Sequence, residues 1–379
     1  MVSTSGRADR QNDYLSFMND ASASFWTATW RRLKKNKGAV LGLVLIILAV
    51  LTAVFAYFIA PDSSPYANRI ILEIGGNKPG FTQSFLQVKK NQPPEQTAFF
   101  IRLINGKPDQ FDLIPVLQSS VQGDSVIAQR FIDEDVVEHT SFHRKELADH
   151  PVIQKRFLLG TDKYGRDILS RIVIGTRVSL SVGLITVLIS LTIGIVLGAI
   201  AGYFKGRWDN IIMWFINIIW SIPTLLLVFA FTLLLGKGFW QVFVAVGLTM
   251  WVNVARLVRG QILAARELQY VEAAKALGFS HFRIIARHIL PNIMGPILVI
   301  AASNFASAIV IEAGLSFLGV GVQPPQPSWG LMIKENYNFI ITQNPMLALA
   351  PGFAIMLLVL AFNLLGNGLR DALNVRGRI

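Results

Sequence analysis

Six apolar stretches dominate this sequence of 379 residues and leave few folds open to it. The first, Ala39–Ala60, is an uncharged run of 22 residues. At a helical rise of about 1.5 Å per residue, such a run can cross a hydrocarbon core of about 30 Å. Five more candidate spans follow: Val178–Phe204, Asn210–Gly236, Phe239–Val254, Ile293–Leu318 and Met346–Leu369. We therefore expect an all-α polytopic membrane protein with six transmembrane helices.

Basic residues near these stretches predict how the chain is oriented. The five that directly precede the first stretch are Arg31, Arg32, Lys34, Lys35 and Lys37. Because lysine and arginine mark the cytoplasmic side, they place the N-terminus there. Six spans that begin inside also end inside, beside Arg370, Arg376 and Arg378. The same count puts the loop 256–292 in the cytoplasm, so the loop, the N-terminus and the C-terminal tail 370–379 share one side.

The charge balance argues against a soluble or nucleic-acid-binding protein. Charged residues make up 15% of the chain, whereas soluble domains carry about 25%. The net charge is +12, but residues 61–160 hold 11 basic and 12 acidic side chains, so the basic excess lies close to the apolar stretches. No basic groove with interleaved aromatic residues is visible, and we expect no nucleic acid partner. The chain has no cysteine, which excludes disulfides and thiolate metal sites.

The N-terminal tail, residues 1–38, contains a candidate interfacial helix. Trp26, Trp30 and Leu33 follow one another at helical spacing and, with Phe25, form an apolar face beside a basic one. Such a helix can lie in the cytoplasmic membrane interface before the first span. A frayed polar tail is the alternative.

Residues 61–159 differ from the apolar stretches and predict a small α+β insert outside the cytoplasm, between the first and second spans. Ala98–Ile104 is aliphatic and aromatic, Asn105-Gly106 follows, and Phe111–Leu117 is rich in β-forming residues. This is the pattern of a β-hairpin. Arg69–Ile74 is a further strand candidate, and Val136–Ala148 is a helix candidate.

Three of the five histidines, His139, His143 and His150, lie in this insert. The first two share one face of the expected helix. No carboxylate or fourth ligand has matching spacing, so solvated surface histidines explain them better than metal capture. We expect no metal site.

A short segment between the fourth and fifth stretches has an unusual composition. Residues 272–292 read EAAKALGFSHFRIIARHILPN. Glu272-Ala273-Ala274 opens an alanine-rich helix with a low, smooth surface, and Gly278 can end it in the left-handed conformation. Ser280 can cap a second helix, and Leu290-Pro291 can stop it. Small side chains let the backbone of another protein come close.

This segment resembles the EAA loop of ABC importer permeases, the element that docks on the ATP-hydrolysing subunit. The family pattern is EAA, three residues, Gly, nine residues, then Ile-x-Leu-Pro. It fits here, except that His288 stands where the isoleucine is usual. The resemblance implies that Glu272, Ala273, Ala274, Gly278, Leu290 and Pro291 couple the chain to an ATPase. An ordinary amphipathic cytoplasmic loop is the alternative.

Two further motifs resemble the dipeptide/oligopeptide (and nickel) transport family of ABC importers, in particular its "C" subunit. GTDKYGRD, residues 160–167, precedes the second span, and EAGLSFLG, residues 312–319, ends the fifth. The resemblance covers the first span and the chain from about Phe157 onward, including the core 160–369. It implies a "B"-type permease, two ATP-binding subunits that hold ATP and Mg²⁺, an outer substrate-binding protein, and the bacterial inner membrane. The insert is longer than typical members carry.

Four residues are candidates for the pathway or its gate. Glu312 is the one acidic residue well inside a span, and an intramembrane carboxylate is functional by default; Gly314 lies beside it. Glu312 can equally brace the outer end of its helix. Pro223, near Ser221, predicts a kinked third span, with or without a role in the pathway. Asp167 can pair with Arg166 or Arg171, and a capping turn is as good an explanation as substrate contact.

The chain lacks the phosphate-binding motif of ATPases, G-x-x-x-x-G-K-[ST]. The protease motif HExxH and the hydrolase motif GxSxG are absent as well. We therefore expect no enzymatic activity and no cofactor in this chain. The expected function is a permease subunit of an ATP-driven importer of di- or oligopeptides, with nickel or another small solute as the alternative substrate. A stand-alone secondary transporter would prefer several intramembrane ionisable residues, and a membrane-anchored scaffold would not require the EAA segment.

Overall fold

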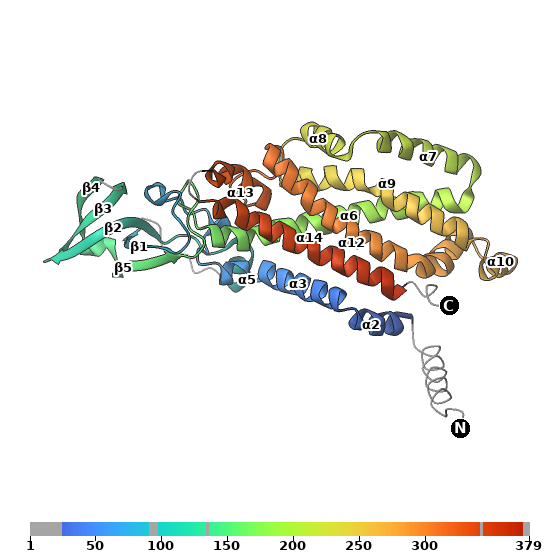
Figure 1. Cartoon of the computed structure of the whole chain (residues 1–379), viewed down its shortest axis with the longest axis horizontal. Helices are drawn as coiled ribbons and strands as arrows, with labels where there is room; N and C mark the ends of the chain where they lie inside the picture. The colour runs from blue at the N-terminus through green and yellow to red at the C-terminus, as the bar shows by residue number, and fades with distance from the viewer. Residues whose placement is uncertain (1–24, 91–97, 134–135, 342–343, 374–379) are drawn as a thin grey trace, which may run out of the picture.

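Long apolar helices form the body of the molecule. The computed structural model describes residues 25–90, 98–133, 136–341 and 344–373 (Figure 1). Within them, five helices are long and apolar enough to cross a membrane, or six spans result if one bent pair counts as a span. The long helices run side by side (Figure 1): α3 (Lys37–Val54), α6 (Ile168–Phe204), α9 (Phe239–Ala265), α12 (Leu290–Leu318) and α14 (Met346–Leu373). Five of the six predicted spans thus coincide with single long helices, although α6 begins and α9 ends well beyond the predicted limits.

The third predicted span is not one helix. α7 (Gly206–Ser221) and α8 (Thr224–Leu235) meet at an angle of 94°. Pro223 stands at the break, where its ring and missing N–H end the helical ladder. The expected kink is therefore a full break, and the pair is either a broken span or a re-entrant element.

Glycines let α6 and α9 pack closely. Gly194, Gly198 and Gly202 follow one another every four residues on α6 and face α9. A Cβ at Gly198 would lie 2.6 Å from the carbonyl oxygen of Ala255, so no larger residue fits without moving a helix. Small residues at this spacing are what brings helix backbones together in membranes, where apolar burial gives little drive.

The segment before the first span is helical, as predicted. α2 (Phe25–Lys35) leads through Asn36, whose side chain accepts a hydrogen bond from the N–H of Ala39, into α3. Leu33 is buried against α14, while Trp30 is exposed. The rest of the predicted tail, residues 1–24, and the tail beyond Leu373, with Arg376 and Arg378, lie outside the described residues.

The insert is built on a five-stranded antiparallel sheet of order β4-β3-β2-β1-β5, at one end of the helical body (Figure 1). The strands are β1 (Phe81–Lys89), β2 (Phe111–Gln122), β3 (Ser125–Asp133), β4 (Val136–His143) and β5 (Leu147–Phe157). One apolar cluster gathers between the strands around Leu86 and Val116. A second joins Phe85 and Phe157 to Ile71 and Ile74 from the chain that leaves the first span.

Three of the element predictions in the insert are wrong. Ala98–Ile104 is not a strand: α5 (Phe99–Asn105) is a helix, and Gly106, at φ 82°, ends it rather than turning a hairpin. Arg69–Ile74 holds a short 3₁₀ turn instead of a strand. Val136–Ala148 is not a helix, because its β-branched residues pair with β3. The prediction of a strand at Phe111–Leu117 is confirmed by β2.

The insert histidines are therefore placed differently from the prediction. His139 and His143 lie on β4 and pair in register with Gln129 and Ser125 of β3. The imidazole of His143 lies 3.2 Å from the carboxylate of Asp124. Within the described residues, no group of three or more potential ligands is placed to hold a metal ion.

Candidate functional site

The alanine-rich segment forms a helical hairpin that projects from one end of the bundle (Figure 1). α10 (Gln269–Ala276) carries Glu272-Ala273-Ala274, and Gly278 follows with φ 75°, the left-handed turn that the sequence predicted. The hydroxyl of Ser280 then accepts a hydrogen bond from the N–H of Arg283 and caps the next helix, also as predicted.

One face of this hairpin packs and the other does not. Val271 and Ala274 are buried against Ile284 and Ile289, so α10 is held to the base of α12. On the outside, Glu272 and Ala273 are exposed, as is the apolar side chain of Leu277, at 73%. Exposed apolar side chains beside small residues are typical of a surface that another protein covers.

The second helix of the hairpin does not stop at Pro291. A short helix (α11, His281–Arg283) continues through a π-helical segment, Ile284–Ile289, directly into α12. Pro291 lies in the first turn of α12, where a missing N–H costs no intrahelical bond. The prediction that Pro291 ends the helix is therefore wrong, and the hairpin is joined to a membrane helix without a loop.

The cytoplasmic end of α6, by the predicted orientation, holds this hairpin in place. The hydroxyl of Tyr203 lies 3.0 Å from Nδ1 of His281. The main-chain oxygen of Tyr203 accepts a hydrogen bond of 2.6 Å from Arg266, just before α10. Lys205 donates a hydrogen bond of 2.9 Å to Glu267 at the surface. Three contacts thus tie the two arms of the hairpin to one helix end.

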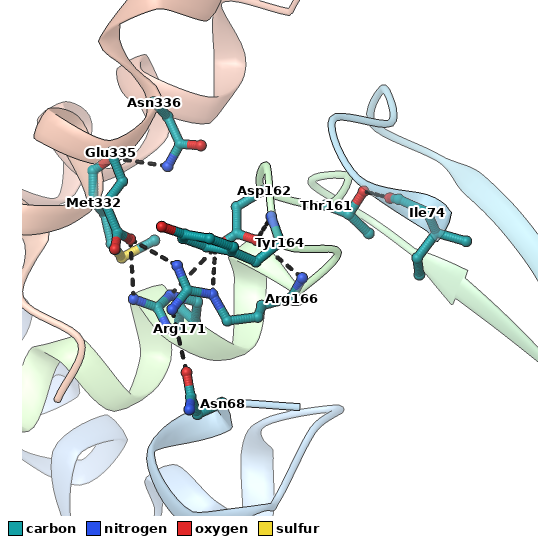
Figure 2. Close-up of polar contacts among 10 residues, drawn as sticks. All are labelled: Asn68, Ile74, Thr161, Asp162, Tyr164, Arg166, Arg171, Met332, Glu335 and Asn336. Carbon is teal, nitrogen blue, oxygen red and sulfur yellow. Dashed lines mark hydrogen bonds and ion pairs between the residues drawn. The ribbon is translucent and has the colours of Figure 1, made fainter. Parts of the chain in front are cut away.

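At the opposite end of α6, four charged side chains form a buried network (Figure 2). Arg166 Nε lies 2.6 Å from Asp162, and its Nη2 lies 2.7 Å from Glu335 on α13 (Trp329–Asn336). Arg171 approaches the same two carboxylates at 3.9 Å and 3.5 Å. Two guanidinium groups and two carboxylates balance one another, which is the condition for burying charge.

This network joins three parts of the chain. Arg166 also donates a hydrogen bond of 3.2 Å to Asn68 in the chain that follows the first span. The hydroxyl of Thr161 bonds the main-chain oxygen of Ile74 nearby (Figure 2). The sequence analysis missed Glu335, since no local pattern in the sequence links it to residues more than 160 positions earlier.

Asp167 caps α6 and does not pair with an arginine. Its carboxylate accepts a 2.9 Å hydrogen bond from the N–H of Ser170, and a second from the Ser170 hydroxyl. Burial raises the pKa of Asp167, while these bonds from Ser170 act in the opposite direction. The expectation that it pairs with Arg166 or Arg171 is wrong, because Asp162 and Glu335 hold those side chains.

Glu312 braces the end of α12 that lies beside α13. It is fully buried, and one of its carboxylate oxygens accepts hydrogen bonds from Ser316 at 2.7 Å and from Ser328 at 2.6 Å. Ser328 in turn caps α13, as predicted. These contacts fit the bracing alternative. Gly314 lies nearby on α12, where an added Cβ would come within 3.9 Å of Leu225 on α8.

A cavity of about 680 Å³ lies between the middles of the helices. Neither Glu312, Gly314, Pro223 nor Asp167 lines it. Its polar lining is uncharged and comes from four helices: Thr224, Thr249, Asn253, Ser303, Asn304, Ser307 and Asn363. A smaller cavity of about 370 Å³ shares Ile300 and Ser303 with it and reaches Arg370 at the end of α14.

Similarity to known proteins agrees with this architecture. Residues 194–378 match the family described as binding-protein-dependent transport system inner membrane component. Residues 24–94 match the N-terminal TM domain of oligopeptide transport permease C. A dipeptide transport system permease protein of Bacillus subtilis, DppC, is 33% identical over 94% of this chain and 88% of its own length.

The chain belongs to this family of transport permeases. A glutathione transport system permease protein of Pectobacterium atrosepticum, GsiD, is 44% identical over 57% of this chain and 71% of its own length. A dipeptide transport system permease protein of Alkalihalophilus pseudofirmus is 45% identical over 57% of this chain and 70% of its own. The permease is thus a membrane subunit of an ABC importer, a transport component rather than a catalytic one.

Proposed function

We propose that this permease forms half of the translocation pathway of an ATP-driven importer of di- or oligopeptides. The observation that carries the proposal is the 33% identity to a dipeptide transport permease across nearly the whole chain, insert included. The uncharged polar cavity between the helices supports it, because it can hold a solute of several hydrogen-bonding groups. Nickel or another small solute is the alternative cargo.

The proposed setting is the bacterial inner membrane, with six spans, both termini in the cytoplasm and the insert outside. The α7–α8 pair is then the third span. The basic residues before α3 and around α10 support this orientation. Because the chain has no cysteine, single cysteines at the exposed positions Asn105 and Gly278 can be labelled with a membrane-impermeant reagent. We expect Asn105→Cys to be labelled from outside and Gly278→Cys only after the membrane is opened; the reverse pattern would contradict the topology.

Coupling to ATP hydrolysis is proposed to run through α10 and the turn after it. Glu272, Ala273, Ala274 and Gly278 would meet an ATP-binding subunit, and Leu290-Pro291 would pass its movement to α12. The support is geometric: the hairpin is exposed on one face, and its second arm continues into a membrane helix. ATP and Mg²⁺ belong to that subunit, which closes with its twin and rocks the packed helices as rigid units.

The full importer is proposed to contain a second, "B"-type permease, two ATP-binding subunits and an outer substrate-binding protein. Glu312, Gly314, Pro223 and Asp167 are kept as candidates for the gate region rather than the cavity wall. Asp167 and Glu312 act on the ends of α6 and α12 through their hydrogen bonds. Pro223 breaks the third span between Trp220 and Thr224, which line the cavity.

The test is uptake by the reconstituted complex. The permease is purified with the subunits that accompany it, placed in proteoliposomes with the binding protein, and supplied with ATP inside or outside. We expect uptake of a labelled dipeptide that requires ATP and Mg²⁺ on the face that carries α10. Uptake of nickel without peptide would favour the alternative cargo, and peptide uptake without any ATPase would overturn the proposal.

A further inference from the structure

The middle of the helical bundle carries polar side chains that face a cavity. Asn253, Asn304 and Asn363 lie near the middles of α9, α12 and α14. All three line the 680 Å³ cavity. Side-chain amides at this depth are costly against hydrocarbon, and they are tolerated where they face a cavity or a polar partner.

These amides have unused hydrogen-bonding capacity. The side chain of Asn304 is buried, at 4% exposure, and its Nδ2 has no hydrogen-bond partner among the described residues. Asn253 and Asn363 are exposed in the cavity, and neither makes a side-chain hydrogen bond within the described part of the chain. An amide offers two donor hydrogens and one acceptor oxygen, and leaving such a buried group unpaired is unfavourable. The three amides therefore have donors and acceptors free to bind a polar group in the cavity.

The lining also lacks charge. Among the described residues that form the larger cavity there is no Asp, Glu, Lys, Arg or His. The charged ends of a short peptide would find hydrogen bonds there but no counter-ion, so this lining does not hold the termini. A peptide bond, in contrast, presents one N–H and one C=O, which match a neutral amide in both directions. The guanidinium of Arg256 stacks at 3.8 Å on Trp220, one of the residues that line the larger cavity, and Arg370 lines the smaller one.

We propose that Asn253, Asn304 and Asn363 form an amide subsite that hydrogen-bonds the main chain of a short peptide in transit, whatever its side chains. The inference rests on the proposed peptide function and adds the recognition chemistry. Contact with the main chain gives the pathway tolerance for many sequences, and the absence of charge lets the peptide leave. Arg370 then lies on the way out, where it can meet the carboxylate end of the peptide.

The experiment compares two cargoes in two proteins. The cargoes are a dipeptide and its ester analogue, in which an ester oxygen replaces the peptide N–H. The proteins are the wild-type complex and the complex with Asn253→Leu and Asn363→Leu, each in proteoliposomes with the same binding protein. Both complexes use the same binding protein. Its preference therefore cancels when the amide-to-ester ratio of uptake rates in the variant is divided by the same ratio in the wild type.

We expect the paired leucine variant to take up the dipeptide about three- to tenfold more slowly, the effect of one or two lost hydrogen bonds. The ester should lose less, so that the preference for amide over ester shrinks by about threefold. Thr192→Leu is the matched control: Thr192 is an exposed polar residue inside α6 that lines neither cavity. Its variant should keep wild-type uptake and the wild-type preference.

Three results would overturn the subsite. One is an unchanged uptake rate, another is an equal loss for amide and ester, and the third is loss of the second permease on purification, which would show that the amides bind that subunit. If the variant with both leucines fails to insert into the membrane, Asn253→Ala with Asn363→Ala allows the same comparison of amide and ester uptake, because the smaller alanine disturbs the packing less. A wild-type complex that carries no peptide at all counts against the proposed function instead.

Discussion

The two ends of α6 are tied to their neighbours in opposite ways. At the end that the proposed topology places outside, Arg166 and Arg171 are almost fully buried with Asp162 and Glu335. At the cytoplasmic end of the proposed topology, Lys205 and Glu267 meet at the surface, both well exposed. The same helix is thus held by buried charge at one end and by exposed pairs and one tyrosine at the other.

This difference indicates which parts of the molecule can move. A buried network with two discrete partners per arginine has few alternative arrangements, so the outer ends of α6 and α13 form one unit with the chain around Asn68. The exposed pair of Lys205 and Glu267 can break and reform at small cost, because water replaces the contact. We expect rocking of the helices to pivot at the outer end and to be driven from the cytoplasmic end.

The largest expected effect is Glu335→Gln at the outer end. It removes the charge that both arginines share and leaves Asp162 to balance two buried guanidinium groups. Removing one partner from a buried ion pair costs about 3–5 kcal/mol. We expect a clear drop in the thermal unfolding temperature of the purified complex and in its abundance in the membrane.

The matched control sits at the other end of the same helix. Glu267→Gln makes the same chemical change in an exposed pair with Lys205. Its unfolding temperature should stay close to that of the wild type. Equal losses in the two variants would show that burial does not distinguish the two ends, and the comparison would fail.

Gly278→Asp is the second prediction and concerns function more than stability. Gly278 has φ 75°, a conformation that resists a Cβ by about 1–2 kcal/mol. A Cβ at Gly278 meets nothing within 4 Å in this chain. Apart from the backbone strain, the aspartate should therefore disturb only the contact with the proposed ATP-binding subunit. We expect normal membrane abundance but no ATP-driven uptake and no substrate-stimulated ATPase activity.

Gly206 provides the control for that change. It also has positive φ, at 57°, and open space around an added Cβ, and it lies at the same end of the bundle, outside the hairpin. Gly206→Asp should therefore carry the same strain and the same charge while transport continues. If both variants lose transport alike, the turn at Gly278 has no special part in coupling.

How far the sequence predicts this molecule differs between its regions. Long apolar runs identify the membrane helices because their length alone excludes other folds. The capped turn at Gly278 and Ser280 was also predictable, since both residues act through their own backbone. The sequence located a kink at Pro223 but not its size. Whether the helical hydrogen bonds continue across a proline depends on the surrounding fold, and here α7 and α8 meet at 94°.

The insert and the buried network were hard to predict for a physical reason. A short run such as Phe99–Asn105 suits a strand or a helix, and only the absence of a neighbouring strand decides. The Asn-Gly pair at 105–106 serves a helix end as well as a hairpin. Glu335 joins Arg166 through the fold alone, so its role appears only in three dimensions.

Tyr203→Phe is the third prediction and tests the tyrosine that holds the hairpin. It removes the hydroxyl that meets His281 at 3.0 Å but keeps the ring contact between the two side chains. The loss of one such hydrogen bond costs about 0.5–1.5 kcal/mol. We expect a small drop in unfolding temperature and a lower ratio of substrate-stimulated to basal ATPase activity. Tyr164→Phe, whose ring packs on Arg166 at the outer end, should leave that ratio unchanged.

The smallest effect is expected from Glu267→Gln itself, measured against pH and salt. A hydrogen bond from Lys205, and then the positive charge of Lys205, hold the pKa of Glu267 below its usual range. A carboxyl whose pKa is lowered by folding adds stability above its unfolded pKa of about 4.3 and loses it as the pH falls through the folded value. The slight difference between wild type and variant should therefore exist near neutral pH and vanish in acid.

Salt should remove the same difference, because exposed charges are screened within about 3 Å at 1 M salt. The unfolding temperatures of wild type and Glu267→Gln, compared near neutral pH at low and high salt, check this directly. A difference that survives high salt would mean that the pair is shielded in the assembled complex, by the ATP-binding subunit that the proposal places beside α10. In that case the cytoplasmic end of α6 would be held as firmly as the outer end. The ATP-binding subunits would then have to move the helices through contacts other than those at this end of α6.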